Sequence, residues 1–177
     1  LVEQLSLQSV TEDFPPDQSL ASLNQLATEL GPFQVRRLST FVKASSAPVD
    51  LYLPSAPTSF FNDATRLSAA APTVVISHGF GNERKTYRYL AEFLATHGFA
   101  VINLEHPGSS AEQFNALVSG RTGQVVPDDE FTRRPELVTQ VLDELETRAS
   151  TDKAFAQIDF NNVGVVGQSF GGYTAKD

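Results

Sequence analysis

The chain of 177 residues contains no cysteine, no methionine and no tryptophan. Without cysteine it can form no disulfide bond and can use no thiol as a catalytic nucleophile. Because methionine is missing even at position 1, we expect the sequence to be an internal fragment of a longer protein. A leader could then precede it, so the sequence leaves both a cytoplasmic and a secreted location open.

Basic residues are also scarce, with 13 Lys and Arg against 21 Asp and Glu and a net charge of −8. This balance disfavours nucleic acid as a partner, because no basic face is available to neutralise phosphates. No apolar run approaches the roughly 18 residues that a membrane span needs, so we expect no transmembrane segment. The three histidines fit no metal-ligand spacing, and no phosphate-binding glycine motif is present, so neither a metal nor another cofactor is expected.

A glycine-serine-glycine pattern stands near the end of the chain. The apolar run 163–166 is followed by Gly-Gln-Ser-Phe-Gly-Gly at 167–172, the order typical of a nucleophile elbow between a buried strand and a helix. In such an elbow Ser169 takes a strained backbone conformation that exposes its Oγ. Gly167 and Gly171 are then required, because strand and helix nearly touch there. The pattern predicts Ser169 as a catalytic nucleophile.

A second motif, His-Gly-Phe-Gly at 78–81, follows the β-branched run 73–77. In α/β-hydrolases a loop of this kind contributes one backbone N–H to the oxyanion hole, and the residue after the nucleophile contributes the other. We therefore predict the N–H groups of Phe80 and Phe170 as the oxyanion donors. The residues expected to shape this loop are His78, Gly79 and Gly81.

Together these motifs resemble the serine α/β-hydrolases grouped with platelet-activating-factor acetylhydrolases and dienelactone-hydrolase-like proteins. The resemblance spans about residues 33 to 175, and two positions depart from it. Gln168 stands where many members carry histidine, and Glu105 stands where aspartate is common; neither change touches the nucleophile. The matching segments are Ile76–Gly81, Leu104–Ser109, Gly167–Gly172, Arg134–Leu137 and Val141–Leu145.

The resemblance implies the N-terminal half of an α/β-hydrolase fold, a mostly parallel sheet with helices on both faces, truncated after the elbow. In this fold the triad acid and then the histidine follow the nucleophile. Only eight residues follow Ser169, with no histidine among them, and Asp177 would lie in the helix just begun. We therefore expect the triad acid and histidine to lie outside this chain. The fragment alone is expected to be inactive and to leave a sheet edge open beside its last strand.

The three histidines present all precede the nucleophile. His78 is expected to brace the oxyanion loop rather than to transfer protons. His97 stands at a helix end beside Gly98, where a structural role is expected. His106 begins a long connection, where a wall of the site or, in preference, an exposed position is expected.

The pattern of residues predicts two parts, a linker and helix over 1–32 that could end an upstream domain, and a partial hydrolase domain over 33–177. In the first part, a helix capped by Ser19 is expected over 20–30. In the second, we expect a helix that begins after Asn82 and ends before Gly98, and another over 135–149 with Pro135 in its first turn. The predicted strands are 33–43, 49–53, 73–77, 99–104 and 163–167.

Residues 107–134 are predicted as a long connection between strand and helix, a feature that is often functional. Its acidic run 128–130 is expected to stay solvated. Its apolar residues could line an acyl pocket or lid, or could belong to a surface loop with a few side chains tucked into the core. They are Phe114, Leu117, Val118, Val125, Val126 and Phe131.

These features favour a serine-dependent carboxylic ester hydrolase that acts through an acyl-enzyme on Ser169. The expected partner is a small-molecule ester, with lipid-like esters among the candidates. A peptidase, a thioesterase or an acyltransferase on the same fold remains an alternative, since fold alone does not decide among these chemistries. The alternative from another class is a non-catalytic, hydrolase-like binding protein.

Overall fold

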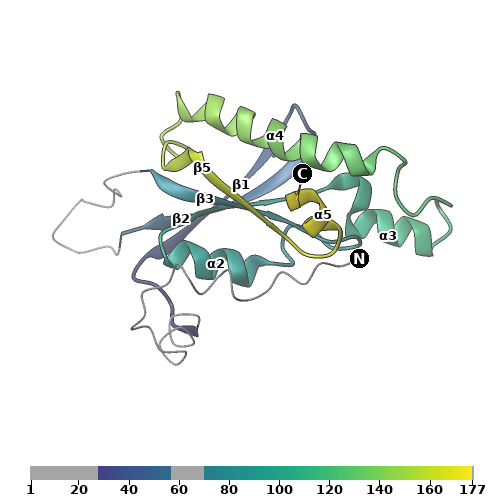
Figure 1. Ribbon diagram of the computed structural model, residues 1–177, viewed down its shortest axis with the longest axis horizontal. Helices are drawn as coiled ribbons and strands as arrows, with labels where there is room; N and C mark the ends of the chain where they lie inside the picture. Colours follow the sequence, from purple (N-terminus) through teal and green to yellow (C-terminus); the bar gives the residue numbers. More distant parts are fainter. Residues whose placement is uncertain (1–27, 57–69, 177) are drawn as a thin grey trace. The chain divides into compact units, whose positions relative to one another are not determined.

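The computed structural model describes residues 28–56 and 70–176 (Figure 1). The chain divides into two compact units, Leu1–Leu30 and Gly31–Asp177, and every element described below belongs to the second. Apart from its last three residues, the predicted helix over 20–30 lies outside the described residues. The division into parts at 32/33 stays a prediction.

The described part contains one five-stranded sheet in the order β1-β2-β4-β3-β5. β1 and β2 form an antiparallel hairpin, β2 runs antiparallel to β4, and β3 runs parallel to both β4 and β5. Within the described residues β5 forms one edge. The strands are β1 (Gln34–Val42), β2 (Ala47–Ser55), β3 (Ala71–Ser77), β4 (Ala100–Leu104) and β5 (Ile158–Gly167). The first four predicted strands agree with these bounds to within two residues, whereas the fifth begins five residues earlier than predicted.

Helices lie on both faces of the sheet, α2 on one face and α4 on the other (Figure 1). α2 links β3 to β4, and α4 links β4 to β5, so both crossovers join parallel strands. This alternation makes the fold α/β, as predicted. The helical segments are α2 (Arg88–Thr96), η2, a 3-10 turn (Pro107–Ser109), α3 (Ala111–Val118), α4 (Glu130–Ala149) and α5 (Phe170–Lys176).

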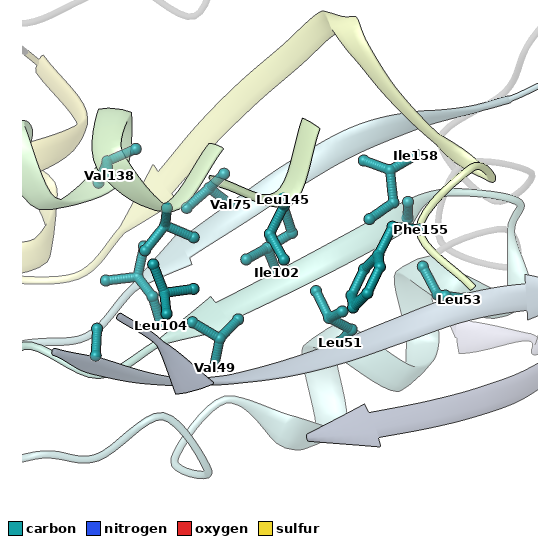
Figure 2. Packing of buried hydrophobic residues seen from close by; sticks show 14 of the residues in the cluster. Val49, Leu51, Leu53, Val75, Ile102, Leu104, Val138, Leu145, Phe155 and Ile158 are labelled. Carbon is teal, nitrogen blue, oxygen red and sulfur yellow. The ribbon is translucent and has the colours of Figure 1, made fainter. Parts of the chain in front are cut away.

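Alternating strand residues supply a core on each face of the sheet. On the α4 face, Val75, Ile102 and Leu51 are fully buried against the apolar stripe of α4, as Figure 2 shows for part of this cluster. On the α2 face, Ile76 and Val101 pack with Ala91 and other apolar residues. The predicted inward stripe of α4 is confirmed, with four buried residues and Leu142 partly buried beside them: Leu137, Val138, Val141 and Leu145.

Two helix starts differ from prediction. Asn82 caps no helix, because its N–H donates to the Gly79 carbonyl (3.2 Å) and its own carbonyl accepts from Ala111 (2.9 Å). These contacts place Asn82 in a turn, and α2 begins only at Arg88. α4 begins at Glu130 and carries Pro135 in its interior rather than in its first turn.

The predicted connection between β4 and α4 is long, but it contains helical segments and ends earlier than predicted. Much of residues 107–134 is helical, since it contains η2, α3 and the first turn of α4. Glu130, expected in solvent, is 3% exposed. Its carboxylate accepts a hydrogen bond from the Ser109 hydroxyl (2.6 Å). This buried contact takes the place of water around the carboxylate, and Glu130 is the first residue of α4.

The sheet brings the ends of β3 and β5 together. In the parallel pairing Ser77 lies opposite Gly167, the last residue of each strand, while Ser77 on its other side faces Leu104. After β3 the chain crosses through α2 to β4 on one side of β3, and after β4 it crosses back through α4 to β5 on the other side. This is a switch point of the kind where α/β sheets bind ligands.

Candidate active site

Ser169 occupies the turn between β5 and α5 with a φ of 55°. Residues other than glycine seldom adopt a positive φ, and such strain persists only where the surroundings enforce it. Here the enforcement is steric. A Cβ on Gly167 would overlap the backbone carbonyl of Gly171, and a Cβ on Gly171 would overlap that of Ser77. Strand and helix can therefore approach this closely only with glycine at both positions.

The backbone of α5 orients the peptide that follows the serine. The Ser169 carbonyl accepts hydrogen bonds from the N–H groups of Gly172 (2.9 Å) and Tyr173 (3.3 Å). In a trans peptide the N–H points opposite to the carbonyl, so the Phe170 N–H is directed away from the helix. Among the described residues it has no hydrogen-bond partner.

The loop after β3 also contains a peptide whose carbonyl is anchored and whose N–H is left without a partner, but here a side chain supplies one of the anchors. The Gly79 carbonyl accepts from the His78 ring at Nδ1 (2.7 Å) and from the Asn82 N–H (3.2 Å). Because the same trans peptide carries the Phe80 N–H, that N–H is directed away from both donors. It too has no partner within the described part of the chain. The next residue, Gly81, has a φ of 75° and donates its N–H to the Ser109 carbonyl (2.9 Å).

The two turns lie against each other. A Cβ on Gly79 would stand 2.8 Å from the Gln168 Oε1 and 3.2 Å from the Gln168 carbonyl oxygen. The Gln168 Oε1 also accepts from the Tyr87 hydroxyl (3.0 Å). The residue before the serine is thus fixed against the loop, and the two partnerless N–H groups belong to adjacent turns.

His78 is fully engaged by the protein. It is 1% exposed, and its Nε2 accepts the backbone N–H of His106 (2.9 Å). An accepting Nε2 requires the proton on Nδ1, which agrees with the bond to the Gly79 carbonyl. Burial lowers the pKa of His78, and the nearby Arg134 charge adds to this. Both ring nitrogens are occupied, so His78 has none left to accept a proton from a serine.

His106 is buried, which corrects the expectation that it would be exposed. Its exposed fraction is 0%, and its Nε2 shares a hydrogen bond with the Ser77 hydroxyl (2.8 Å). Burial first, and then the charge of Arg134, lower the pKa of His106 to about 2. The ring is therefore neutral at physiological pH. His97, as expected, follows the end of α2, where its ring packs on Phe93 with centroids 4.6 Å apart.

Two charged residues at the start of α4 were missed by the motif reasoning. Arg134 is 1% exposed and Glu130 is 3% exposed, and the Ser109 hydroxyl bridges them, accepting from Arg134 Nη1 (2.9 Å) and donating to Glu130 (2.6 Å). Burial lowers the pKa of Arg134 to about 10 while Glu130 opposes the shift, so the guanidinium stays charged at neutral pH. No local sequence pattern marks either residue, because the groups that they hydrogen-bond to lie far away in the sequence.

Aromatic rings surround the two turns. Phe170 packs on Phe131 (centroids 4.8 Å apart), and Phe131 packs edge-on against Tyr173 (5.2 Å). On the loop side, Phe80 packs edge-on against Phe114 (5.9 Å). Phe114, Phe131 and Tyr173 each keep more than two fifths of their surface exposed. The rings therefore present apolar surface beside the serine.

The described residues hold no group of three His, Cys, Asp or Glu side chains placed to bind a metal ion. In the same residues, no helix is both long and apolar enough to cross a membrane.

Comparison with known proteins supplies a family for this geometry. The family model described as platelet-activating factor acetylhydrolase, isoform II, matches residues 38–129. This is an α/β-hydrolase family. The matched stretch includes the loop at 78–81 and ends before the serine turn. A search of curated proteins finds no match.

Proposed function

The chain belongs to the platelet-activating factor acetylhydrolase isoform II family of hydrolases, and we propose that it hydrolyses carboxylic esters with Ser169 as the nucleophile. The Ser169 Oγ attacks the ester carbonyl carbon, and the carbonyl oxygen becomes an oxyanion that accepts from the N–H groups of Phe80 and Phe170. Collapse of this intermediate expels the alcohol and leaves an acyl-enzyme. Water then attacks the acyl carbon and releases the acid.

The observation that carries this proposal is the matched pair of anchored peptides. In each turn the carbonyl is held by two internal donors, which leaves the N–H of Phe80 or of Phe170 directed away and partnerless among the described residues. Ser169, the residue before Phe170, is held at a φ of 55°. Preorganised donors of this kind lower the barrier because they need no rearrangement as charge develops.

The serine also needs a proton acceptor. His78 and His106 are not suited to that task, since the first uses both ring nitrogens and the second is buried with a pKa of about 2. His97 follows α2 at the end of the sheet where β4 begins, opposite to the strand ends that carry the site. We propose that the base is a histidine outside this chain, oriented by a carboxylate that is also outside it, in the order that the α/β-hydrolase fold uses. Proton transfer from Ser169 to that histidine would accompany the attack.

The substrate we propose is a small-molecule ester with an apolar part. The exposed faces of Phe114, Phe131 and Tyr173 can cover an acyl chain or an apolar alcohol, and lipid-like esters fit this chemistry. Burying such a chain contributes about 0.8 kcal/mol per methylene group. Activity should therefore rise from acetyl to butyryl esters.

Replacement of the nucleophile tests the proposal. In the full-length protein, Ser169→Ala should reduce turnover of p-nitrophenyl butyrate at least about 10⁴-fold, since loss of a triad member leaves only oxyanion stabilisation and binding. Ser119→Ala, at the exposed end of α3, is the matched control and should behave as wild type. Turnover that persists in Ser169→Ala with an unchanged unfolding midpoint would refute the assignment. A wild-type protein that neither turns over esters nor reacts with a fluorophosphonate would favour the non-catalytic alternative.

A further inference from the structure

Arg134 is the largest fully buried side chain in the described part of the molecule, at 1% exposure. No carboxylate of the described residues lies within ion-pair distance of it; Glu130 acts on its charge from farther away and shares the Ser109 hydroxyl with it. Burying a guanidinium in this way is costly, and an apolar side chain of similar volume would serve packing alone at lower cost. Packing alone therefore does not explain why an arginine occupies this position.

Its donors reach three separate segments. Nε donates to the Thr174 hydroxyl on α5 (2.9 Å), and Nη1 donates to the Ser109 hydroxyl in η2 (2.9 Å). Nη2 donates to the Ser77 hydroxyl at the end of β3 (3.1 Å) and to the carbonyl of His78. One planar group thus joins the helix after the serine to the loop after β3.

Both ends of this connection sit next to a proposed oxyanion donor. The His78 carbonyl lies in the peptide immediately before the Gly79–Phe80 peptide, and His78 Nδ1 anchors the carbonyl of that second peptide (2.7 Å). On the other side, the Thr174 hydroxyl donates to the Phe170 carbonyl (3.1 Å), and the guanidinium lies over the Phe170 ring, 4.4 Å from its centroid.

We propose that Arg134 is a positioning residue that fixes the Phe80 N–H and the Phe170 N–H relative to each other, so that one oxyanion can accept from both. The inference rests on the proposed function, because it presupposes that these two groups bind the oxyanion. A guanidinium suits the task, since its donors lie in a rigid plane and point in different directions. A lysine ammonium keeps the charge but cannot span the three segments.

The test separates the rate at each functional site from the number of functional sites. In the full-length protein, the stoichiometry of fluorophosphonate labelling at completion counts the competent serines. Steady-state turnover divided by that count gives kcat per site. We expect Arg134→Lys and Arg134→Met to lower kcat per site by about 10-fold to 10²-fold, because a misplacement near 1 Å has effects of that size. KM should change less than threefold, since the guanidinium does not touch substrate.

Arg148 provides a matched control on the same helix. Its guanidinium also bridges α4 to distant groups, the Thr40 hydroxyl (2.8 Å) and the Phe41 carbonyl (2.8 Å) on β1, and it pairs with Glu144. Arg148→Ala should lower the unfolding midpoint and leave kcat per site unchanged. A wild-type kcat per site in the Arg134 variants, even with fewer competent sites, would show that Arg134 is merely structural.

If the Arg134 variants give no competent sites, Thr174→Val decides, because it removes the link from Arg134 through the Thr174 hydroxyl to the Phe170 carbonyl and leaves the other Arg134 hydrogen bonds in place. A fall in its kcat per site of about 10-fold with unchanged KM would support the proposal, and a wild-type value would overturn it. Ser169→Ala in the same assay keeps the two claims apart. Labelling of that variant would refute the proposed function, whereas an unreactive Ser169→Ala beside a fully active Arg134→Lys would refute only the positioning role.

Discussion

The serine turn and the loop after β3 present the same group, a partnerless backbone N–H, but are held by different means. The serine turn is fixed mainly by backbone, through close contacts at Gly167 and Gly171 and through α5 hydrogen bonds to the Ser169 carbonyl. The loop is fixed by side chains, namely the His78 ring and the guanidinium of Arg134. The residue types that the serine turn requires lie within six residues, although Gly171 is restricted by the distant Ser77 carbonyl, whereas the loop depends on hydrogen-bond partners elsewhere in the sequence.

The separation along the chain shows this dependence. His78 is held by the N–H of His106, which is 28 residues away, and its carbonyl is held by Arg134, which is 56 residues away. The loop can therefore reach its geometry only after β4 and α4 have packed. Mutations should accordingly disrupt the serine turn through sterics and disrupt the loop through lost hydrogen bonds.

The largest effect is expected in the serine turn. Gly171→Ala would place a Cβ on the Ser77 carbonyl, whereas a Cβ on Gly172 would meet nothing closer than the Gly167 carbonyl oxygen at 3.4 Å. We expect Gly171→Ala to lower the free energy of unfolding by at least about 4 kcal/mol and Gly172→Ala to change it by less than about 1 kcal/mol. Urea unfolding measures both. Equal losses would show that close approach is not what fixes this turn.

In the loop, two substitutions of His78 separate its two hydrogen bonds. Asparagine can replace the Nδ1 donor to Gly79, while glutamine can replace the Nε2 acceptor for His106. If the Gly79 carbonyl aims the Phe80 N–H, His78→Gln should lower kcat about 10²-fold and His78→Asn less than about 10-fold. Ester kinetics on both variants would check this, and the reverse ranking would mean that the contact to His106 matters more.

The buried ring of His106 should also make the free energy of unfolding depend on pH. The folded-state pKa of His106 is about 2, below its ordinary value of 6.5, so below pH 6.5 only the unfolded chain takes up the proton and acid favours unfolding. From pH 7 to pH 5 this amounts to about 2 kcal/mol. His106→Gln, which cannot titrate, should lose about 2 kcal/mol less over that range in urea unfolding. An identical pH dependence in variant and wild type would contradict the buried neutral ring.

The smallest effect is expected from the side chain of Phe80. Phe80→Ala keeps the backbone N–H and removes only the ring that packs on Phe114, so kcat should fall less than about 10-fold. Gly79→Val, which forces the loop away from Gln168, should lower kcat by about 10² to 10³. Steady-state kinetics measures kcat for both variants. A loss in Phe80→Ala as severe as in Gly79→Val would mean that the ring binds substrate.

Much of the fold could be predicted from sequence because strands and amphipathic helices carry local signals. The inward stripe of α4 was found from its spacing, and four of the five strands were placed to within two residues. Errors arose where distant contacts override a local signal. Pro135 suggested a helix start, yet the buried contacts of Glu130 and Arg134 extend α4 by five residues toward the N-terminus.

The site divides in the same way. Ser169 and its two glycines could be predicted because a tight turn between strand and helix restricts residue type locally. The roles of His106 and Arg134 in the structure could not, since a histidine or arginine becomes buried only through partners that the tertiary fold supplies. His106 was expected in solvent for this reason, and it is instead 0% exposed.

A crystal structure of the full-length protein after reaction with a fluorophosphonate would test the shared role of the two turns most directly. The adduct places a phosphoryl oxygen where the oxyanion would form. We expect phosphorus on the Ser169 Oγ and that oxygen between about 2.7 and 3.1 Å from the backbone nitrogens of both Phe80 and Phe170. Phosphorus on another residue, or an oxygen that accepts from neither nitrogen, would contradict the proposed active site.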